Sequence, residues 1–203
     1  CIAWEVQVMD NATQDKLFAA AIPLFAEKGY AGVSIRDIAK AADVNVSSIS
    51  YYFRGKEGLY HAIIESHIAA ISRAISSAEG LAPAERLKHY AKAISEIHTK
   101  KPYVIRFVQS ELVNPTSALD KILKKHLFSF YRFLNKAIQD GMDEGAFRAD
   151  LNVHHAALSL VGIMNFYFIA KPLFRDFLDT SLKADIAYAE QAVNIYLEGI
   201  RRK

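Results

Sequence analysis

Small hydroxyls, phenols and a cation follow one another closely in the stretch VSSISYYFRGK, residues 46–56. On a helix, Ile49 and Phe53 lie four positions apart and share an inward face. The outward face then carries Val46, Ser47, Ser50 and Tyr51. Side chains this small let a helix backbone come close to a partner, and hydroxyl groups can bond base edges or phosphate oxygens. The chemistry that this pattern predicts is contact with nucleic acid in a groove.

Lys56 adds a positive charge where the next helix is expected to begin. The first turn of a helix has free N–H groups and the positive end of the helix dipole, and both favour a phosphate. The wider charge balance adds little, because acidic residues offset the basic ones around this stretch and the net charge of the chain is only +3. Spacing alone therefore leaves a DNA-contacting helix and a plain packed helical hairpin equally open.

Other chemistry finds little support in the sequence. Cys1 is the only cysteine, so neither an internal disulfide nor a cysteine metal cluster can form. The seven histidines make no H-x-x-x-H or H-E-x-x-H spacing, and no nucleophile elbow, P-loop or dinucleotide-binding glycine motif is present. We expect no catalytic residues, no metal and no cofactor, and therefore a protein that is not an enzyme.

Helices must position these residues, because a periodicity of 3.6 residues runs through most of the chain and strand-like alternation is absent. With 52% hydrophobic residues the chain can fill a sizeable core. We expect an all-α fold of about nine helices, at residues 12–28, 35–42, 46–52, 56–77, 83–100, 102–113, 117–144, 152–170 and 183–201.

Side chains at the expected helix ends support the first boundaries. Ser34 and Asp37 form a variant of the capping box, and Asn45 is a good N-cap for the next helix. Between these helices, Asp43 tolerates a left-handed turn better than most residues do. Two short helices joined by such a turn and braced by a preceding helix describe a helix-turn-helix, whose second helix enters the DNA major groove.

The string FAEKGYAGVSIRDIAKAADVNVSSISYYFRGKEGLY, residues 25–60, closely resembles the N-terminal DNA-binding domain of the TetR family of bacterial transcriptional regulators. The resemblance covers about residues 13–62 without gaps. It implies a homodimer, and a C-terminal helical domain that carries dimerisation and usually a small-molecule pocket. We therefore divide the chain into an N-terminal extension (1–11), a helix-turn-helix domain (12–55), and a linking helix with the C-terminal domain (56–203).

The resemblance also implies roles for single residues, with residues 46–52 in the major groove. Val46, Ser47, Ser50 and Tyr51 match positions of the family that contact DNA bases or the DNA backbone in the groove. Positions that contact phosphate match Thr13, Ser34, Ser48, Tyr52 and Lys56. Two positions depart from the family pattern. Asp43 stands where glycine is common, and Ser50 stands where tyrosine is common, which leaves the operator sequence open.

The C-terminal part is rich in aromatic residues, which either fill a core and a dimer interface or enclose an apolar pocket. For a pocket, the candidate ligand-binding residues are Tyr103, Arg106, Phe107, Glu111, His126, Tyr131, Asn165 and Tyr167. The last two helices, near 152–170 and 183–201, resemble the dimerisation elements of the family. Small and apolar residues there are expected to form the dimer face: Ala156, Ala157, Leu160, Val161, Met164, Ala189, Ala192, Val193 and Tyr196.

The expected function is that of a ligand-responsive homodimeric repressor, which binds a palindromic DNA operator and is released by a small, largely apolar or aromatic effector. Two alternatives remain open. One is a helix-turn-helix regulator without a small-molecule ligand, acting as an activator or under the control of a partner protein. The other is a small-molecule-binding helical protein whose N-terminal hairpin is only structural.

The location of the protein is inferred from what its sequence contains. No apolar run reaches the roughly 20 residues that span a bilayer. With the single cysteine, which favours a reducing compartment, this predicts a cytoplasmic protein without a membrane partner. The resemblance to the family implies that it is bacterial. Met9 reads like a natural start, and we expect residues 1–8 to come from cloning or from an upstream reading frame.

Overall fold

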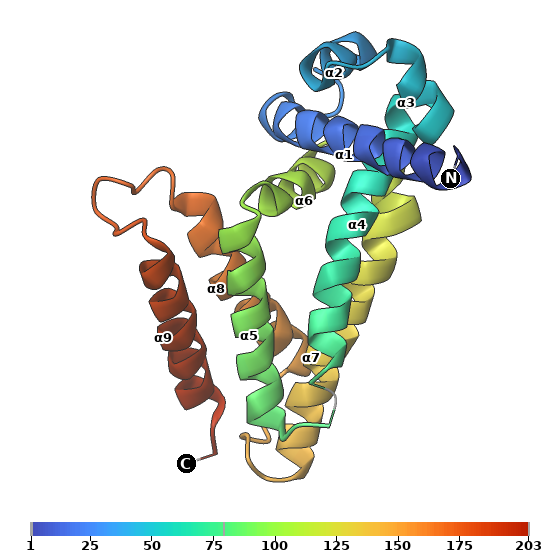
Figure 1. Cartoon of the computed structure of the whole chain (residues 1–203). Coiled ribbons are helices and arrows are strands. Elements are labelled where there is room, and N and C mark those ends of the chain that lie inside the picture. Colours follow the sequence, from blue (N-terminus) through green and yellow to red (C-terminus); the bar gives the residue numbers. More distant parts are fainter. Residues whose placement is uncertain (1, 79, 203) are drawn as a thin grey trace. The chain divides into compact units, whose positions relative to one another are not determined.

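The computed structural model describes residues 2–78 and 80–202. Within them the chain forms nine α-helices and one short π-helix (Figure 1). They are α1 (Ile2–Lys28), α2 (Ile35–Ala42), α3 (Val46–Phe53), α4 (Lys56–Ser76), α5 (Pro83–Lys100), α6 (Tyr103–Val113), the π-helix η1 (Leu119–Leu123), α7 (Lys124–Asp143), α8 (Val153–Ala170) and α9 (Leu182–Ile200). The all-α class predicted from the periodicity is confirmed.

Local signals explain most of these boundaries. Gly29 follows α1 with a φ of +69°, the left-handed conformation that glycine adopts without strain. Pro83 occupies the first turn of α5, where its missing N–H costs nothing. The side chains of Asn152 and Ser181 cap α8 and α9 by accepting hydrogen bonds from backbone N–H groups of the first turn.

One boundary and one helix interior differ from those predicted. α1 begins at Ile2 rather than near residue 12, because residues 2–11 contain no proline or glycine to interrupt the helix. Cys1 lies outside the described residues, and the origin of residues 1–8 stays a prediction. The helix expected at 117–144 does begin at residue 117, and the difference lies inside it, where Leu119–Leu123 form the π-helix η1. Side-chain oxygens hold the backbone N–H groups of Thr116 and Ala118 at its start.

The chain divides into two compact units. The first comprises Cys1–His67 and Arg106–Leu123, and the second comprises Ile68–Ile105 and Lys124–Lys203. The helix-turn-helix therefore shares a unit with most of α6 and with η1, which follow it by some 50 residues in the sequence. The proposed division at 12–55 and 56–203 stays a prediction about function.

Each unit has its own apolar core. In the first unit, α1 packs against α2 and α3, and the fully buried side chains include Leu17, Ile38, Ile49 and Leu59. In the second unit, α5 packs against α7, α8 and α9 (Figure 1). Its fully buried side chains include Leu87, Leu134, Ala157, Leu160 and Met164. Each of the fully buried leucine, isoleucine and methionine side chains stabilises the fold by about 1.5–3 kcal/mol.

The prediction of which residues of α8 and α9 form the dimer face is wrong. Ala157, Leu160 and Met164 of α8, and Ala189 and Val193 of α9, are buried within the chain itself. These residues belong to the core of the second unit, where α8 and α9 pack against each other and against α5. They are therefore not available to a second copy of the chain.

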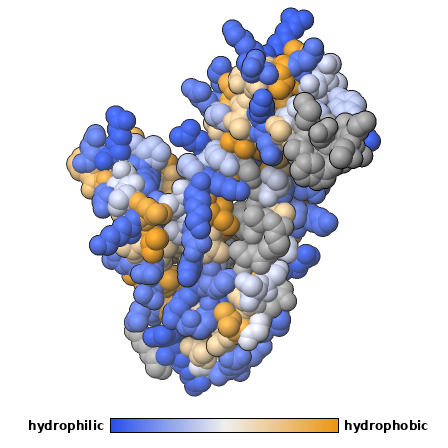
Figure 2. All heavy atoms as spheres, viewed as in Figure 1, coloured by the Kyte–Doolittle hydropathy of each residue, from blue (hydrophilic) through white to orange (hydrophobic). Residues whose placement is uncertain are grey.

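The apolar side chains that α8 and α9 leave at the surface lie on other faces of these helices. They include Leu158, Phe166 and Ile169 of α8, and Ile195 of α9. Figure 2 shows that apolar surface lies interspersed with polar side chains on the face in view.

α8 also corrects the statement that no stretch is long enough to span a bilayer. Among the described residues, Val153–Ala170 is the one helix that is long and apolar enough to do so by length and composition. Core helices of soluble proteins pass the same test. The buried side of α8 accounts for part of its apolar content, and its exposed apolar side requires a separate explanation.

Candidate nucleic-acid interface

A reciprocal pair of hydrogen bonds fixes the start of α2. The Asp37 backbone N–H donates to Ser34 Oγ at 3.2 Å, and the Ser34 backbone N–H donates to Asp37 Oδ2 at 3.0 Å. The capping box predicted from the sequence is therefore confirmed. Hydrogen bonds from Ser34, first from its hydroxyl and then from its backbone, hold the pKa of the Asp37 carboxyl below its usual range.

The turn between α2 and α3 forms as the sequence predicts. Asp43 ends α2 with φ 51° and ψ 52°, in the left-handed region. Asn45 then caps α3, because its Oδ1 accepts hydrogen bonds from the Ser47 backbone N–H at 2.9 Å and from Ser47 Oγ at 2.8 Å. This turn sets the direction in which α3 leaves α2, and with it the side of α3 that reaches the surface.

The two faces of α3 are those expected from its spacing. Ile49 is fully buried, and the Phe53 ring stacks on Phe18 of α1 with ring centroids 5.5 Å apart. Tyr51 is 76% exposed. The other outward side chains are also exposed: Val46, Ser47 and Ser50. α3 therefore presents a row of small and hydroxyl-bearing side chains to the surface, supported from behind by an apolar contact.

The predicted phosphate-contact residues lie in the same compact unit as α3. Ser34 is exposed at the start of α2, and Thr13, Ser48 and Tyr52 are half-buried. The rings of Tyr51 and Tyr52 meet edge to face with centroids 4.8 Å apart, so each restricts the other's position. The part of each residue in binding DNA stays a prediction.

Lys56 has a structural role that the sequence did not reveal. Its ammonium group donates hydrogen bonds to the backbone carbonyls of Tyr30 at 2.9 Å and Val33 at 2.8 Å. The same nitrogen lies 4.2 Å from the centroid of the Tyr30 ring, in a cation–π contact. Lys56 thereby ties the start of α4 to the segment between α1 and α2. Its predicted contact with phosphate competes with this role.

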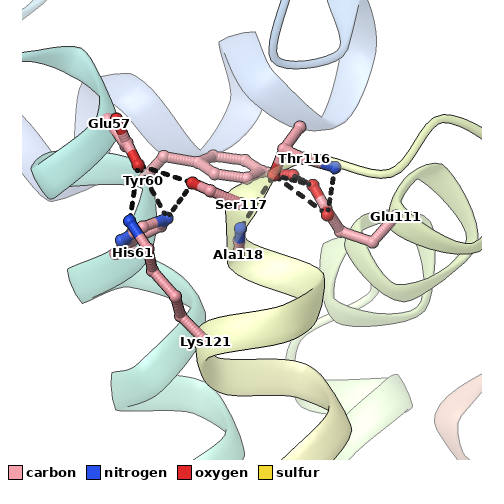
Figure 3. Close-up of polar contacts among 8 residues, drawn as sticks. All are labelled: Glu57, Tyr60, His61, Glu111, Thr116, Ser117, Ala118 and Lys121. Atoms are coloured by element: carbon pink, nitrogen blue, oxygen red, sulfur yellow. Dashed lines mark hydrogen bonds and ion pairs between the residues drawn. The ribbon is translucent and has the colours of Figure 1, made fainter.

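A buried carboxylate lies in the same compact unit as the helix-turn-helix, between α6 and α4 (Figure 3). Glu111 of α6 is fully buried and accepts hydrogen bonds from Tyr60 Oη of α4 at 2.8 Å, from the Thr116 backbone N–H at 3.0 Å and from Thr116 Oγ1 at 2.9 Å. Burial, and secondarily the hydrogen bond to Glu111, raises the pKa of the Tyr60 phenol above its usual value. Glu111 therefore joins α6 and the following loop to α4.

A second polar cluster lies close to the first, at a more exposed place (Figure 3). Glu57 Oε1 accepts hydrogen bonds from Ser117 Oγ at 2.5 Å and from Lys121 Nζ at 3.2 Å. These contacts, with that of Ser117 the larger, lower the pKa of the Glu57 carboxyl. His61 Nε2 lies 3.1 Å from Ser117 Oγ. Both ends of the loop between α6 and α7 are thus bonded to α4.

The eight candidate ligand-binding residues are divided between the two units. Arg106, Phe107 and Glu111 belong to the first unit, and the other five belong to the second. Several of these five have partners within the second unit. Asn165 Oδ1 lies 2.9 Å from His98 Nε2, Tyr167 Oη donates to Asp185 Oδ1 at 3.0 Å, and Tyr131 Oη lies 2.9 Å from His154 Nδ1. Burial, followed by the Asp185 contacts, raises the pKa of Tyr167 to about 12.

A pocket of about 420 Å³ in the second unit is lined by other residues. Among its described lining, Arg86, Arg132 and Lys136 carry charge, and none of them was singled out in the sequence. The available signal was the spacing of Arg132 and Lys136, which places both on one face of a helix. Arg86 comes from a different helix, and no local pattern could have brought it to them. The assignment of ligand-binding residues stays a prediction.

Comparisons with known proteins agree with the geometry. The sequence model described as "Bacterial regulatory proteins, tetR family" matches residues 17–63, and that of the "Tetracyclin repressor-like, C-terminal domain" matches residues 83–195. The first match contains α2 and α3, and the second covers most of α5 to α9. The two models together therefore account for both the DNA-binding part and the C-terminal part.

Individual relatives are similar over much of the chain. The probable HTH-type transcriptional regulator YttP of Bacillus subtilis is 31% identical over 137 residues, a match that spans 66% of this chain and 66% of YttP, just under two thirds. The HTH-type transcriptional repressor NicS of Pseudomonas putida is 26% identical over 199 residues, covering 95% of this chain and 94% of NicS.

A solved structure confirms the fold. The ketosteroid transcriptional regulator KstR2 of Mycobacterium tuberculosis superposes with a TM-score of 0.79, covering 94% of this chain and 95% of that one. Its identity of 20% shows a shared fold alone.

The match of the C-terminal sequence model spans more than half of the chain, and α3 presents its outward side chains as a recognition helix does. This chain therefore belongs to the tetR family of bacterial regulatory proteins and is a DNA-binding transcriptional regulator.

Proposed function

We propose that the protein is a ligand-responsive homodimeric repressor that binds a near-palindromic operator through residues 46–52 of α3. The observation that carries the proposal is the surface of α3, where Ser47, Ser50 and Tyr51 are exposed while Ile49 is fully buried. Small hydroxyl-bearing side chains allow the helix to enter the major groove and to bond base edges there.

The homodimer would form through α8 and α9. Leu158, Phe166 and Ile169 leave an apolar strip on α8, and Ile195 leaves another apolar side chain on α9. A second copy related by a two-fold axis would cover the same strip on both subunits. Two recognition helices in one dimer would then read two half-sites about one helical turn of DNA apart or somewhat more, which is why the operator should be near-palindromic.

Control by an effector follows from a difference in affinity between two states. In one state of the dimer the recognition helices fit the two half-sites, and in the other their spacing is wrong. A small molecule that binds the C-terminal domain more tightly in the second state shifts the protein toward it and lowers its affinity for DNA. Repression by similar proteins, such as NicS, which is named a repressor, supports the choice of repressor over activator. The protein would act in the cytoplasm, where the DNA is.

Fluorescence anisotropy on the purified protein tests the DNA-binding part of the proposal. The probes are labelled duplexes from the region beside its own gene and scrambled duplexes of equal length, measured over a series of salt concentrations. We expect tighter binding to the genomic duplex, and weaker binding to both as salt increases, because counterions are released from phosphates. Tyr51→Ala should change the preference among operator variants. No binding of the unchanged protein at low salt would contradict α3 as the reading helix. An equal loss of affinity for every duplex in Tyr51→Ala would contradict it as well.

A further inference from the structure

The pocket in the second unit lies where side chains of α4, α5 and α7 converge. It has a volume of about 420 Å³, within the range of small-molecule sites. Three cationic side chains line it: Arg86 from α5, and Arg132 and Lys136 from α7. The residues described as lining it include no acidic side chain. Its polar lining is therefore suited to a negatively charged group.

One carboxylate lies close to these cations and offsets part of their charge. Asp140 accepts hydrogen bonds from Arg86 Nη2 at 2.7 Å and from Lys136 Nζ at 3.2 Å. Three positive charges against one negative charge leave this wall positively charged. The Arg86 contact is also the main reason that the pKa of the Asp140 carboxyl lies below its usual range, so Asp140 is ionised and orients Arg86 at neutral pH.

Arg86 is built into the structure rather than displayed on its surface. The residue is only 5% exposed, and its Nε is buried without a hydrogen-bond partner among the described residues. Because Asp140 holds its Nη2, the guanidinium of Arg86 is fixed in place and presents its positive charge to the pocket that it lines. Arg132, by contrast, is exposed at the same pocket and is free to close over a ligand.

The rest of the lining indicates what the anion is attached to. Ile75 of α4 is buried, and the rings of Phe130 and Phe133 from α7 are half-buried in the pocket wall. An inorganic ion would leave this apolar surface uncovered, whereas a ligand with a short aliphatic or aromatic body would cover it. Charge on one side and apolar surface on the other therefore select an amphipathic organic anion.

We propose that this pocket binds an organic anion, a carboxylate or a phosphate monoester on a short apolar body, with its charged group among Arg86, Arg132 and Lys136. The proposal rests on the proposed function in one respect, that the bound anion is the effector. The effector expected from the sequence is a small, largely apolar or aromatic molecule, and this proposal adds that it carries a negatively charged group.

Direct binding to the full chain, without DNA, tests the site. Isothermal titration calorimetry would compare octanoate, octyl phosphate and octan-1-ol, which share one apolar body and differ in the head group. We expect at least one of the two anions to bind about tenfold or more tightly than the alcohol, because only a charged oxygen forms charge-assisted bonds with the cations. Binding of either anion alone supports the proposal and identifies the head group. The proposal is overturned if octan-1-ol binds as tightly as the anions. It is also overturned if neither anion binds up to its solubility limit.

A matched pair of variants locates the anion. Arg132→Ala removes an exposed pocket cation and should weaken anion binding about tenfold while leaving the alcohol unchanged. Lys125→Ala removes an exposed cation of the same helix that is not among the described pocket lining, and should leave both unchanged. Circular dichroism would confirm that both variants fold. Equal losses in the two variants would show a general charge effect and overturn the site.

The effector role is separated from the site by repeating the DNA anisotropy assay with the anion that binds. Release of the genomic duplex by this anion, lost in Arg132→Ala, supports both the site and its role. Anion binding that depends on Arg132 but leaves DNA affinity unchanged overturns the effector role and leaves the site standing. Failure of the protein to bind any DNA affects the proposed function alone, because the calorimetry contains no DNA.

Discussion

Lys56 has one role that the structure shows and one that is predicted, and the two compete for the same ammonium group. The resemblance to the family assigns it to a DNA phosphate, whereas in the structure its ammonium group bonds the backbone carbonyls of Tyr30 and Val33. A group that already satisfies two buried or half-buried acceptors gains less from a new partner, because each old bond must be weakened first. The two roles make different predictions for a variant.

Lys56→Met keeps the aliphatic stem and removes the charge. We expect the free energy of unfolding to fall by about 1–3 kcal/mol, because two carbonyl oxygens lose their donor. Urea denaturation measures this loss, and Lys40→Met, an exposed lysine of α2, is the control, with an expected change within about 0.5 kcal/mol. If Lys56 also contacts phosphate, the salt slope of DNA binding should fall by about one. An unchanged stability would show that the carbonyl contacts are incidental.

At the scale of elements, α4, which follows the helix-turn-helix directly, is bonded to α6, a helix that comes much later in the chain. Glu111 of α6 bonds Tyr60 of α4, and the loop after α6 bonds α4 again through Ser117 and Glu57 (Figure 3). Buried carboxylates are unfavourable unless their oxygens are bonded, and Glu111 satisfies this condition with a phenol, a hydroxyl and a backbone N–H. The polar contacts therefore fix which turn of α6 lies against α4.

Glu111→Ala should be among the most destabilising single changes in the first unit. It leaves the buried Tyr60 hydroxyl and the Thr116 backbone N–H without an acceptor, for an expected loss of about 3 kcal/mol in the free energy of unfolding. Chemical denaturation followed by circular dichroism measures the loss. Glu96→Ala, which removes an exposed partner of Lys100, is the control and should change the stability by less than about 1 kcal/mol. Equal effects of the two variants would mean that the buried contacts contribute little.

For the whole molecule, the exposed apolar surface of α8 and α9 is the feature that a single chain leaves unexplained. Phe166 is 65% exposed and Ile195 is 63% exposed. Large apolar side chains grouped on one surface commonly mark an interaction site. A second copy of the chain covers such a surface without exposing new apolar area, because both subunits contribute the same patch.

The double variant Phe166→Asp with Ile195→Asp should convert the protein to a monomer, because two charges would have to be buried at the two-fold interface. Light scattering coupled to size-exclusion chromatography measures the mass. The affinity for a palindromic operator should fall on the order of 100-fold, because the second half-site is no longer bound by the same molecule. Leu112→Asp, at a 61% exposed position of α6, is the control and should leave the dimer intact. A double variant that remains dimeric would place the interface elsewhere.

The sequence by itself determined the features that depend on neighbours within one or two helical turns. The capping box of Ser34 and Asp37, the left-handed Asp43 and the Asn45 cap all form as predicted, because their hydrogen bonds join residues two to four apart. The same holds for the inward and outward faces of α3, since the helical repeat alone decides which side chains share a face.

Only the tertiary structure decided which distant residues meet. Glu111 finds Tyr60 across 51 positions, Arg86 finds Asp140 across 54, and the ammonium of Lys56 finds carbonyls more than 20 positions earlier. Nor could periodicity say which apolar face of α8 would be buried. Both of its sides are apolar, and packing against α7, α9 and α5 selected one of them. Local hydrogen bonds and helical repeats are written into short stretches of sequence, whereas a partner for a buried charge or an apolar face exists only once the helices have packed.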